Sequence, residues 1–188
     1  MNKKYYFLVI FLTFLILFTP FLFFFLPSPK TPEISVEGYA LQLRIRYVYL
    51  YKDGDLFGAG ELVAEYSPAF ISFPLSLLRS EGSRTFSAEE SPWVTLYGLS
   101  IGSSFSVCLF DQDKVGRDLL VQMNFVLESP PPLDLEFSIR PSPTFPLGEM
   151  SSSGPFSYSV QHAKHVIING ERFYNYMSVT FVFTSYTS

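Results

Sequence analysis

An alternation of apolar and polar residues marks the longest regular segment of the chain, residues 41–51 (LQLRIRYVYLY). A period of two is typical of a β-strand that buries one of its faces. Residues 177–185 (MSVTFVFTS) show the same period near the other end of the chain. We therefore predict a β-strand in each of these segments.

Shorter β-prone runs lie between these two segments, and clusters of Gly, Pro, Asp or Ser separate most of them. They are residues 61–66, 93–98, 104–110, 119–127 and 133–139. No segment after residue 30 has the helical period of 3.6. Closely spaced strands with turn signals indicate an all-β domain, either an antiparallel β-sandwich or a jelly roll.

Turn-forming residues set two further segments apart. Asn169 and Gly170 separate the runs HVII and ERFYNYM, and Asn-Gly between two such runs predicts a hairpin with a type I′ turn. Residues 140–155 are rich in Pro, Ser and Gly, and we predict a long surface loop there.

The first 30 residues differ in kind from this domain. Residues 5–26 are 22 residues without a charge, which is long enough for a membrane-spanning helix of roughly 20 apolar residues. Lys3 and Lys4 precede them, and such residues stay on the cytoplasmic side. We therefore predict a signal anchor, a single-pass hydrophobic helix in the cell membrane with the C-terminal domain outside. A cleaved signal peptide, which would leave a secreted domain, is the second interpretation, although no small-residue cleavage site follows.

These patterns divide the chain into residues 1–30 as anchor or signal peptide, 31–40 as a linker and 41–188 as the β-sandwich domain. All 17 acidic residues lie after residue 30 with 10 of the 13 Lys and Arg residues, so this part has a formal charge of −7. An acidic surface argues against nucleic acid as a partner, because phosphates require a basic patch. Cys108 is the only cysteine, which excludes an intrachain disulfide, and its apolar neighbours predict a core position.

Two clusters of carboxylates lie beside strand-like runs. Residues 109–120 read LFDQDKVGRDLL, and residues 52–61 read KDGDLFGAGE. Calcium takes about 6–8 oxygen ligands, mostly carboxylates and carbonyls, and loops at one end of a sandwich can bring two such clusters together. The predicted calcium ligands are Asp53, Asp55, Glu61, Asp111, Asp113 and Asp118. The alternative is that they are ordinary solvated turn residues.

The pattern resembles that of a C2 domain. In that family one loop carries two aspartates before an apolar strand, and another carries D-x-D followed by a further aspartate. Asp55 and Glu61 match the first pair, and the segment FSVCLFDQDKVGRD, with Asp111, Asp113 and Asp118, matches the second. The resemblance covers roughly residues 41–126 and implies a C2-like calcium-binding β-sandwich.

The chain departs from the family's pattern at three points. Glu61 stands where the family has an aspartate, Leu62 stands where a proline is common, and Asp118 comes one residue early without a glycine after it. A C2-like sandwich is therefore favoured over a C2 domain that docks on membranes.

The favoured function is a cell-surface or secreted calcium-binding β-sandwich with a structural or interaction role. The alternative is a subunit of an extracellular filament or surface layer, in which residues 34–45 or 177–185 add as a strand to a neighbouring subunit. The partners implied are the membrane, through an uncleaved helix, and a protein or further copies of the chain. An enzyme is the least favoured class, because both histidines lie in one segment and no nucleophile or cofactor motif is found.

Overall fold

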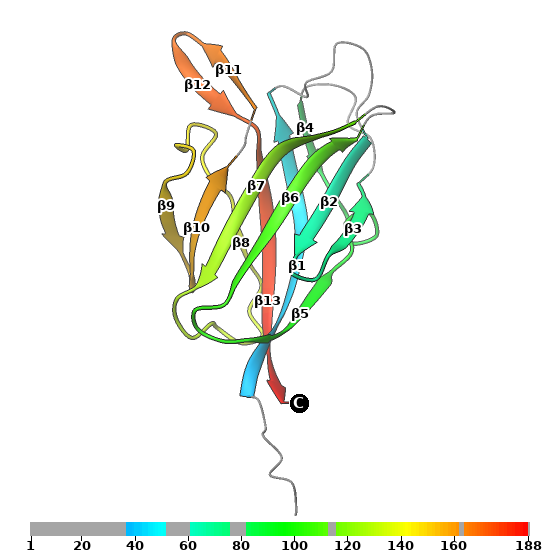
Figure 1. Cartoon of the computed structure of the whole chain (residues 1–188), viewed down its shortest axis with the longest axis vertical. Helices are drawn as coiled ribbons and strands as arrows, with labels where there is room; N and C mark the ends of the chain where they lie inside the picture. Colours follow the sequence, from blue (N-terminus) through cyan, green and yellow to red (C-terminus); the bar gives the residue numbers. More distant parts are fainter. Residues whose placement is uncertain (1–36, 52–60, 76–81, 113–115, 162–163, 188) are drawn as a thin grey trace, which may run out of the picture. The chain divides into compact units, whose positions relative to one another are not determined.

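Two antiparallel sheets and a separate hairpin contain the thirteen strands of the part of the chain that the structure describes (Figure 1). The structure is a computed structural model, and it describes residues 37–51, 61–75, 82–112, 116–161 and 164–187. The strands are β1 (Glu37–Leu50), β2 (Glu61–Ser67), β3 (Ile71–Pro74), β4 (Gly82–Thr85), β5 (Val94–Leu99), β6 (Ser104–Gln112), β7 (Arg117–Leu127), β8 (Phe137–Ile139), β9 (Met150–Ser153), β10 (Phe156–Gln161), β11 (His165–Ile168), β12 (Glu171–Tyr174) and β13 (Tyr176–Thr187).

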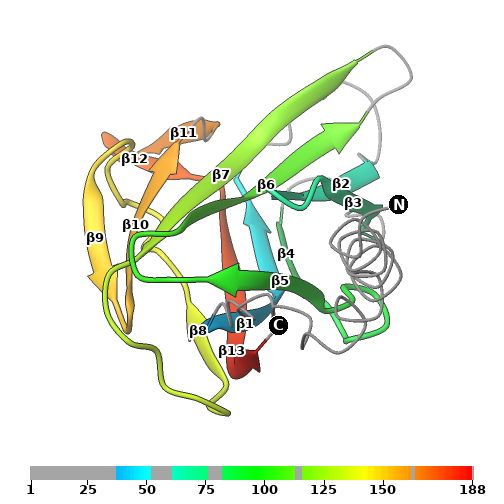
Figure 2. The same ribbon diagram turned by 60° about the horizontal axis from the view of Figure 1, so that its bottom comes forward.

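The first sheet has the order β4-β1-β13-β8, and β5 also pairs with β1. β4 and β5 share β1, since β4 pairs with its last residues and β5 with its first. The second sheet has the order β3-β2-β6-β7-β10-β9, and β11 pairs with β12 in the hairpin. Seen toward one end, the two sheets lie face to face as a sandwich (Figure 2).

β1 and β13 form the long central pair of the first sheet. Their register places Leu41 opposite Phe183 and Leu43 opposite Phe181, and all four side chains are fully buried. Alternate residues of a strand point to opposite faces of its sheet, so both strands direct this row of side chains inward. The two alternating segments of the sequence are therefore the strands at the centre of this sheet.

Phenylalanines from both sheets meet between them. Phe105 on β6 stacks on Phe125 of β7 with 5.0 Å between ring centroids, and Phe181 on β13 meets Phe125 edge-on at 5.2 Å. Phe156 on β10 lies 5.0 Å from Phe181. Aromatic pairs at such distances add about 0.5–1.5 kcal/mol each beyond the burial of their area. These rings join the two sheets into one core.

The predicted all-β architecture is confirmed, but the sequence pattern does not predict β3, β4, β9 and β10. The surface loop predicted at residues 140–155 ends at Met150, where β9 begins and pairs with β10 at the edge of the second sheet. β9 is short and serine-rich (MSSS), so it has no hydrophobic alternation of its own. Its strand conformation depends on the hydrogen bonds to β10.

Two local predictions have different outcomes. The hairpin turn is confirmed, because Asn169 and Gly170 both have a positive φ, 52° and 85°, as the central residues of a type I′ turn require. The core position of Cys108 is wrong, since it is half-buried. Val107 and Leu109 on either side of it face the core, so alternation places Cys108 on the outer face of β6.

The predicted N-terminal hydrophobic helix, residues 1–30, lies outside the described residues. Within the part that is described, no helix has the length and apolar character needed to cross a bilayer. β1 begins at Glu37, inside the segment 31–40 that the sequence suggests as a linker.

Candidate calcium site

The described ends of the two acidic segments lie next to each other at one end of the second sheet. β2 begins at Glu61, β6 ends at Gln112, and the register of these neighbouring strands places the two residues opposite each other. The start of β2 and the end of β6 are therefore neighbours, at the upper end in Figure 1. Asp53, Asp55 and Asp113 lie outside the described residues, and of Glu61 only the backbone is described.

Asp111 is a buried carboxylate at this end of the sheet. It follows Val107 and Leu109 in the row of β6 that faces the core, and only 2% of its surface is exposed. In the part of the chain that the structure describes, it is the only buried residue of a charged type. Burying a carboxylate costs several kcal/mol unless a cation or hydrogen-bond donors compensate its charge. The core-facing row of β6 thus ends in a group that requires such compensation.

Asp118 lies directly across from Asp111, on β7. Its side chain is 61% exposed, and its Oδ2 accepts a hydrogen bond of 2.7 Å from Nζ of Lys164. The N–H of Lys164 donates to the carbonyl of Leu120 (3.3 Å), and its carbonyl accepts from the N–H of Asn175 (3.0 Å). Two carboxylates in opposite cross-strand positions repel each other, and the ammonium group offsets part of that repulsion.

The residue types predicted from the sequence as ligands are those that a hard cation prefers. All six predicted ligands are carboxylates, and calcium binds oxygen donors of this kind. Asp111 and Asp118 are the two whose side chains the structure describes, and their strands hold them opposite each other. Among the described residues no group of three or more His, Cys, Asp or Glu side chains could hold a metal ion. A calcium ion here would therefore also need carboxylates from residues 52–61 and 113–115.

Two basic residues beside the site were not among the sequence candidates. Arg117, next to Asp118, makes an ion pair of 2.9 Å with Glu65, and its guanidinium lies 3.8 Å from the ring centroid of Phe110. These two contacts connect Arg117 on β7 with Phe110 on β6 and Glu65 on β2. The sequence signal that could have identified Arg117 is its position within the acidic segment. Lys164 is 46 residues from Asp118, and no pattern in the sequence connects the two.

A cluster of tyrosines lies on the outer face of the first sheet. The rings of Tyr49 and Tyr176 stack at 5.6 Å with 3° between their planes, and Tyr51 lies 4.5 Å from Tyr49. Arg140 lies 4.4 Å from the ring centroid of Tyr47 and donates a hydrogen bond of 2.7 Å to the hydroxyl of Tyr176. This hydrogen bond raises the pKa of Arg140, and burial raises the pKa of Tyr176. The cluster therefore holds a charged guanidinium against aromatic rings.

No protein-family model matches this chain, and no curated protein matches it. Among solved structures, a C2 domain (domain A) of a plant extended synaptotagmin 1 aligns over 81% of this chain and 98% of its own, with a TM-score of 0.50 and 9% sequence identity. Human GIVD cytosolic phospholipase A2 aligns over 81% of this chain and 17% of its own, with a TM-score of 0.47 and 15% identity. A further structure of a C2 domain aligns over 78% and 98%, with a TM-score of 0.39 and 10% identity.

The described part of the chain has a C2-like β-sandwich fold. The resemblance inferred from the acidic segments is therefore confirmed for the fold. At 9% identity the likeness carries no ligand or activity from that protein to this one.

Proposed function

We propose that this chain is a calcium-binding C2-like domain, held at the outer face of a cell membrane by its N-terminal apolar segment, with a structural or interaction role. The observation that carries the calcium proposal is the strand register, which sets Glu61 opposite Gln112 and Asp111 opposite Asp118. The described ends of two acidic segments that are distant in the sequence are thereby side by side at one end of the sandwich. Asp111 is buried at this end, and its carboxylate belongs to the oxygen donors that calcium binds.

The proposed location depends on the composition of the first 30 residues. Residues 5–26 carry no charge, and Lys3 and Lys4 precede them, which favours a membrane anchor with the domain outside. If the segment is cleaved, the same domain is secreted. The calcium proposal is the same for both forms, because every proposed ligand lies after residue 52.

The alternative, a filament or surface-layer subunit, needs a strand that is free to pair with a neighbouring subunit. The described part of both segments, residues 37–45 and 177–185, lies inside the first sheet, since β1 pairs with β13, β4 and β5, and β13 pairs with β1 and β8. Among the described strands, β9 is at an edge and pairs with β10 alone. Strand addition would therefore use an edge such as β9.

Thermal unfolding of the full chain in detergent micelles, in chelator and in millimolar calcium, tests the proposed function. Ligand at about 100 times its dissociation constant stabilises a protein by roughly 2.7 kcal/mol, so we expect calcium to raise the Tm by several degrees. An unchanged Tm in calcium would show that these carboxylates do not form a calcium site.

Matched variants test which carboxylates are responsible for the rise in Tm in calcium. Asp111→Asn combined with Asp118→Asn should remove most of the calcium-dependent rise in Tm. Glu128→Gln combined with Asp134→Asn removes the same charge from the β7–β8 connection, at the other end of β7, and should leave the rise intact. If both double variants lose the calcium-dependent rise in Tm equally, the rise depends on the net charge of the protein and calcium binds elsewhere.

A further inference from the structure

Large apolar side chains are exposed at the end of the sandwich opposite the acidic segments. They lie on β5 and on the β5–β6 and β7–β8 connections, which surround the end that comes forward in Figure 2. The exposed fractions are 65% for Tyr97, 55% for Ile101, 47% for Leu133 and 55% for Leu135. We refer to these four residues as the base patch.

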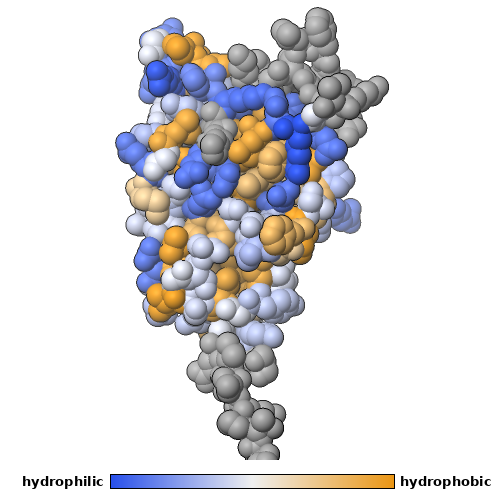
Figure 3. All heavy atoms as spheres, in the orientation of Figure 1, coloured by the Kyte–Doolittle hydropathy of each residue, from blue (hydrophilic) through white to orange (hydrophobic). Residues whose placement is uncertain are grey.

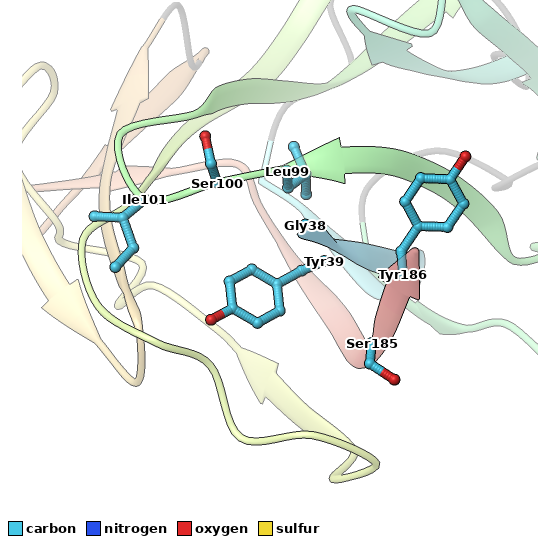
Figure 4. Close-up of a pocket in the computed structure, with 7 residues that line it drawn as sticks. All are labelled: Gly38, Tyr39, Leu99, Ser100, Ile101, Ser185 and Tyr186. Atoms are coloured by element: carbon cyan, nitrogen blue, oxygen red, sulfur yellow. The ribbon is translucent and has the colours of Figure 1, made fainter. Parts of the chain in front are cut away.

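A hollow of about 590 Å³ adjoins the base patch. It is lined by the first residues of β1, the end of β5 and the end of β13, and Figure 4 shows Tyr39 and Ile101 on one side and Tyr186 on the other. The rings of Tyr97 and Tyr186 lie 5.2 Å apart, so the patch and the hollow form a continuous surface. Tyrosine combines an apolar ring with a hydroxyl and is enriched where a protein meets the membrane–water interface.

The charges of the described connections at this end do not favour an anionic surface. The described connections at the base, residues 68–70, 100–103, 128–136 and 154–155, contain Glu128, Asp134 and Glu136 and no Lys or Arg. Figure 3 shows the strongly hydrophilic residues of one face gathered in its upper half, with mostly apolar and weakly polar residues below. A zwitterionic lipid surface therefore suits this end better than an anionic one, because contact there depends on apolar burial.

The length of the connection to the apolar segment indicates which end is nearer to a membrane. β1 begins at Glu37 at the base and runs for 14 residues toward the acidic segments, a rise of about 46 Å at roughly 3.3 Å per residue. Residues 27–36 between the apolar segment and β1 can span at most about 35 Å. An inverted domain, with its acidic segments on the bilayer that holds the apolar segment, would need a longer connection.

We infer that the base patch rests on the zwitterionic lipid surface of the membrane that holds the N-terminal segment, with the proposed calcium site directed away from it. This inference rests on the membrane anchorage in the proposed function. It assigns the two ends of the sandwich different tasks: the base positions the domain on its own membrane, and the acidic end is presented to a partner.

Fluorescence quenching of the full chain in phosphatidylcholine nanodiscs, with chelator present, tests this inference. The chain has one tryptophan, so Trp93→Phe combined with Tyr97→Trp places a single reporter in the base patch. Trp93→Phe combined with Ile167→Trp places a matched reporter on the β11–β12 hairpin, where Ile167 is also 65% exposed. Brominated phosphatidylcholine should quench the Tyr97→Trp reporter and leave the Ile167→Trp reporter unquenched.

A second comparison assigns the quenching to the patch. Ile101→Ser, Leu133→Ser and Leu135→Ser together should abolish quenching of the Tyr97→Trp reporter, whereas Ile167→Ser with Ile168→Ser should preserve it. All five residues are exposed, so the fold should tolerate these changes, and unchanged circular dichroism would verify this. Adding phosphatidylserine should weaken the quenching, since the base connections carry only acidic charges.

The possible failures are distinguishable. A chain that does not co-purify with nanodiscs lacks the anchor, and both the proposed location and this inference are then wrong. A chain that co-purifies but shows equal quenching of the two reporters contradicts the base contact alone. If the triple serine variant changes the size of the complex and not the quenching, the patch is an interface between copies of the chain, which also overturns the inference.

Discussion

Asp111 is the charged residue in a row of β6 side chains that is otherwise apolar. The row of β6 that contains Phe105, Val107 and Leu109 is buried against the core, and Asp111 continues it with the same degree of burial. An apolar residue at this position would be buried without an electrostatic cost. Asp111 is therefore the one position in this row whose burial has an electrostatic cost.

Lys164 should compete with calcium for Asp118. Its Nζ lies 2.7 Å from Oδ2 of Asp118, so an ammonium group occupies the place of a cation beside that carboxylate. Exposed ion pairs contribute roughly 0.2–1 kcal/mol, and Lys164→Gln should therefore raise the calcium affinity by up to about fivefold. Calorimetric titration at constant ionic strength measures this. Arg46→Gln removes a cation from the Glu136 ion pair and should have no effect, and an equal rise in both variants would contradict a local role.

Glu90 should contribute pH-dependent stability. A hydrogen bond from the N–H of Ser87, followed by one from Arg84, holds the pKa of Glu90 at about 2, below its usual value of 4.5. Because the folded pKa is the lower one, the unfolded chain binds the proton first as the pH falls. The stabilisation is therefore complete above about pH 4.5 and is lost as the pH approaches 2.

Glu90→Gln should accordingly lower the Tm at pH 7 and bring it together with that of the unchanged chain near pH 2. The measurement is thermal unfolding over this pH range, with Glu89→Gln as the control for removing a neighbouring exposed carboxylate. A difference in Tm that does not change with pH would mean that the glutamine disturbs the turn for another reason.

At the scale of strands and turns, the sequence predicts what is encoded locally. β1 and β13 contain most of the two alternating segments, residues 41–51 and 177–185, and Asn169 with Gly170 specifies its turn through backbone conformation alone. β4 and β9 consist of GSRT and MSSS, which have no apolar face, and they exist through pairing with β1 and β10. Their conformation depends on contacts that are distant in the sequence.

The candidate site likewise has some features that the local sequence encodes and others that depend on the topology. The two acidic segments are visible in the sequence because aspartates cluster beside strand-like runs. That β2 lies next to β6 is a property of the topology, and the register that sets Glu61 opposite Gln112 follows from it. The contact between Lys164 and Asp118 depends on where the chain passes after β10, which no local pattern encodes.

Gly170 should be the sensitive residue of the β11–β12 hairpin. Its φ of 85° lies in the left-handed region, which costs a residue with a Cβ about 1–2 kcal/mol. Gly170→Ala should therefore accelerate amide hydrogen exchange in β11 and β12. The sandwich should retain its Tm, because neither strand pairs with another described strand. Glu171→Ala, at the next position, should leave the exchange slow, and equal acceleration by both variants would contradict a conformational cause.

For the whole molecule, the central question is whether the two sheets unfold as one unit. Phe181 on β13 contacts Phe105, Phe125 and Phe156 of the second sheet at 6.3, 5.2 and 5.0 Å, and it is fully buried. Core contacts of this kind make the stability of each sheet depend on the other. Removing one ring should therefore destabilise both sheets together.

Phe181→Ala should lower the free energy of unfolding by about 3–5 kcal/mol, the loss typical of a large aromatic residue removed from a core. Denaturant unfolding of the full chain in micelles measures this with two probes, the fluorescence of Trp93 beside the first sheet and circular dichroism of all strands. Met150→Ala, at an edge position that is 61% exposed, should change the stability by less than about 0.5 kcal/mol. Coincident transitions in both probes, shifted together by Phe181→Ala, are expected. If only the fluorescence transition moved, the sheets would be independent units and the shared aromatic core would not couple them.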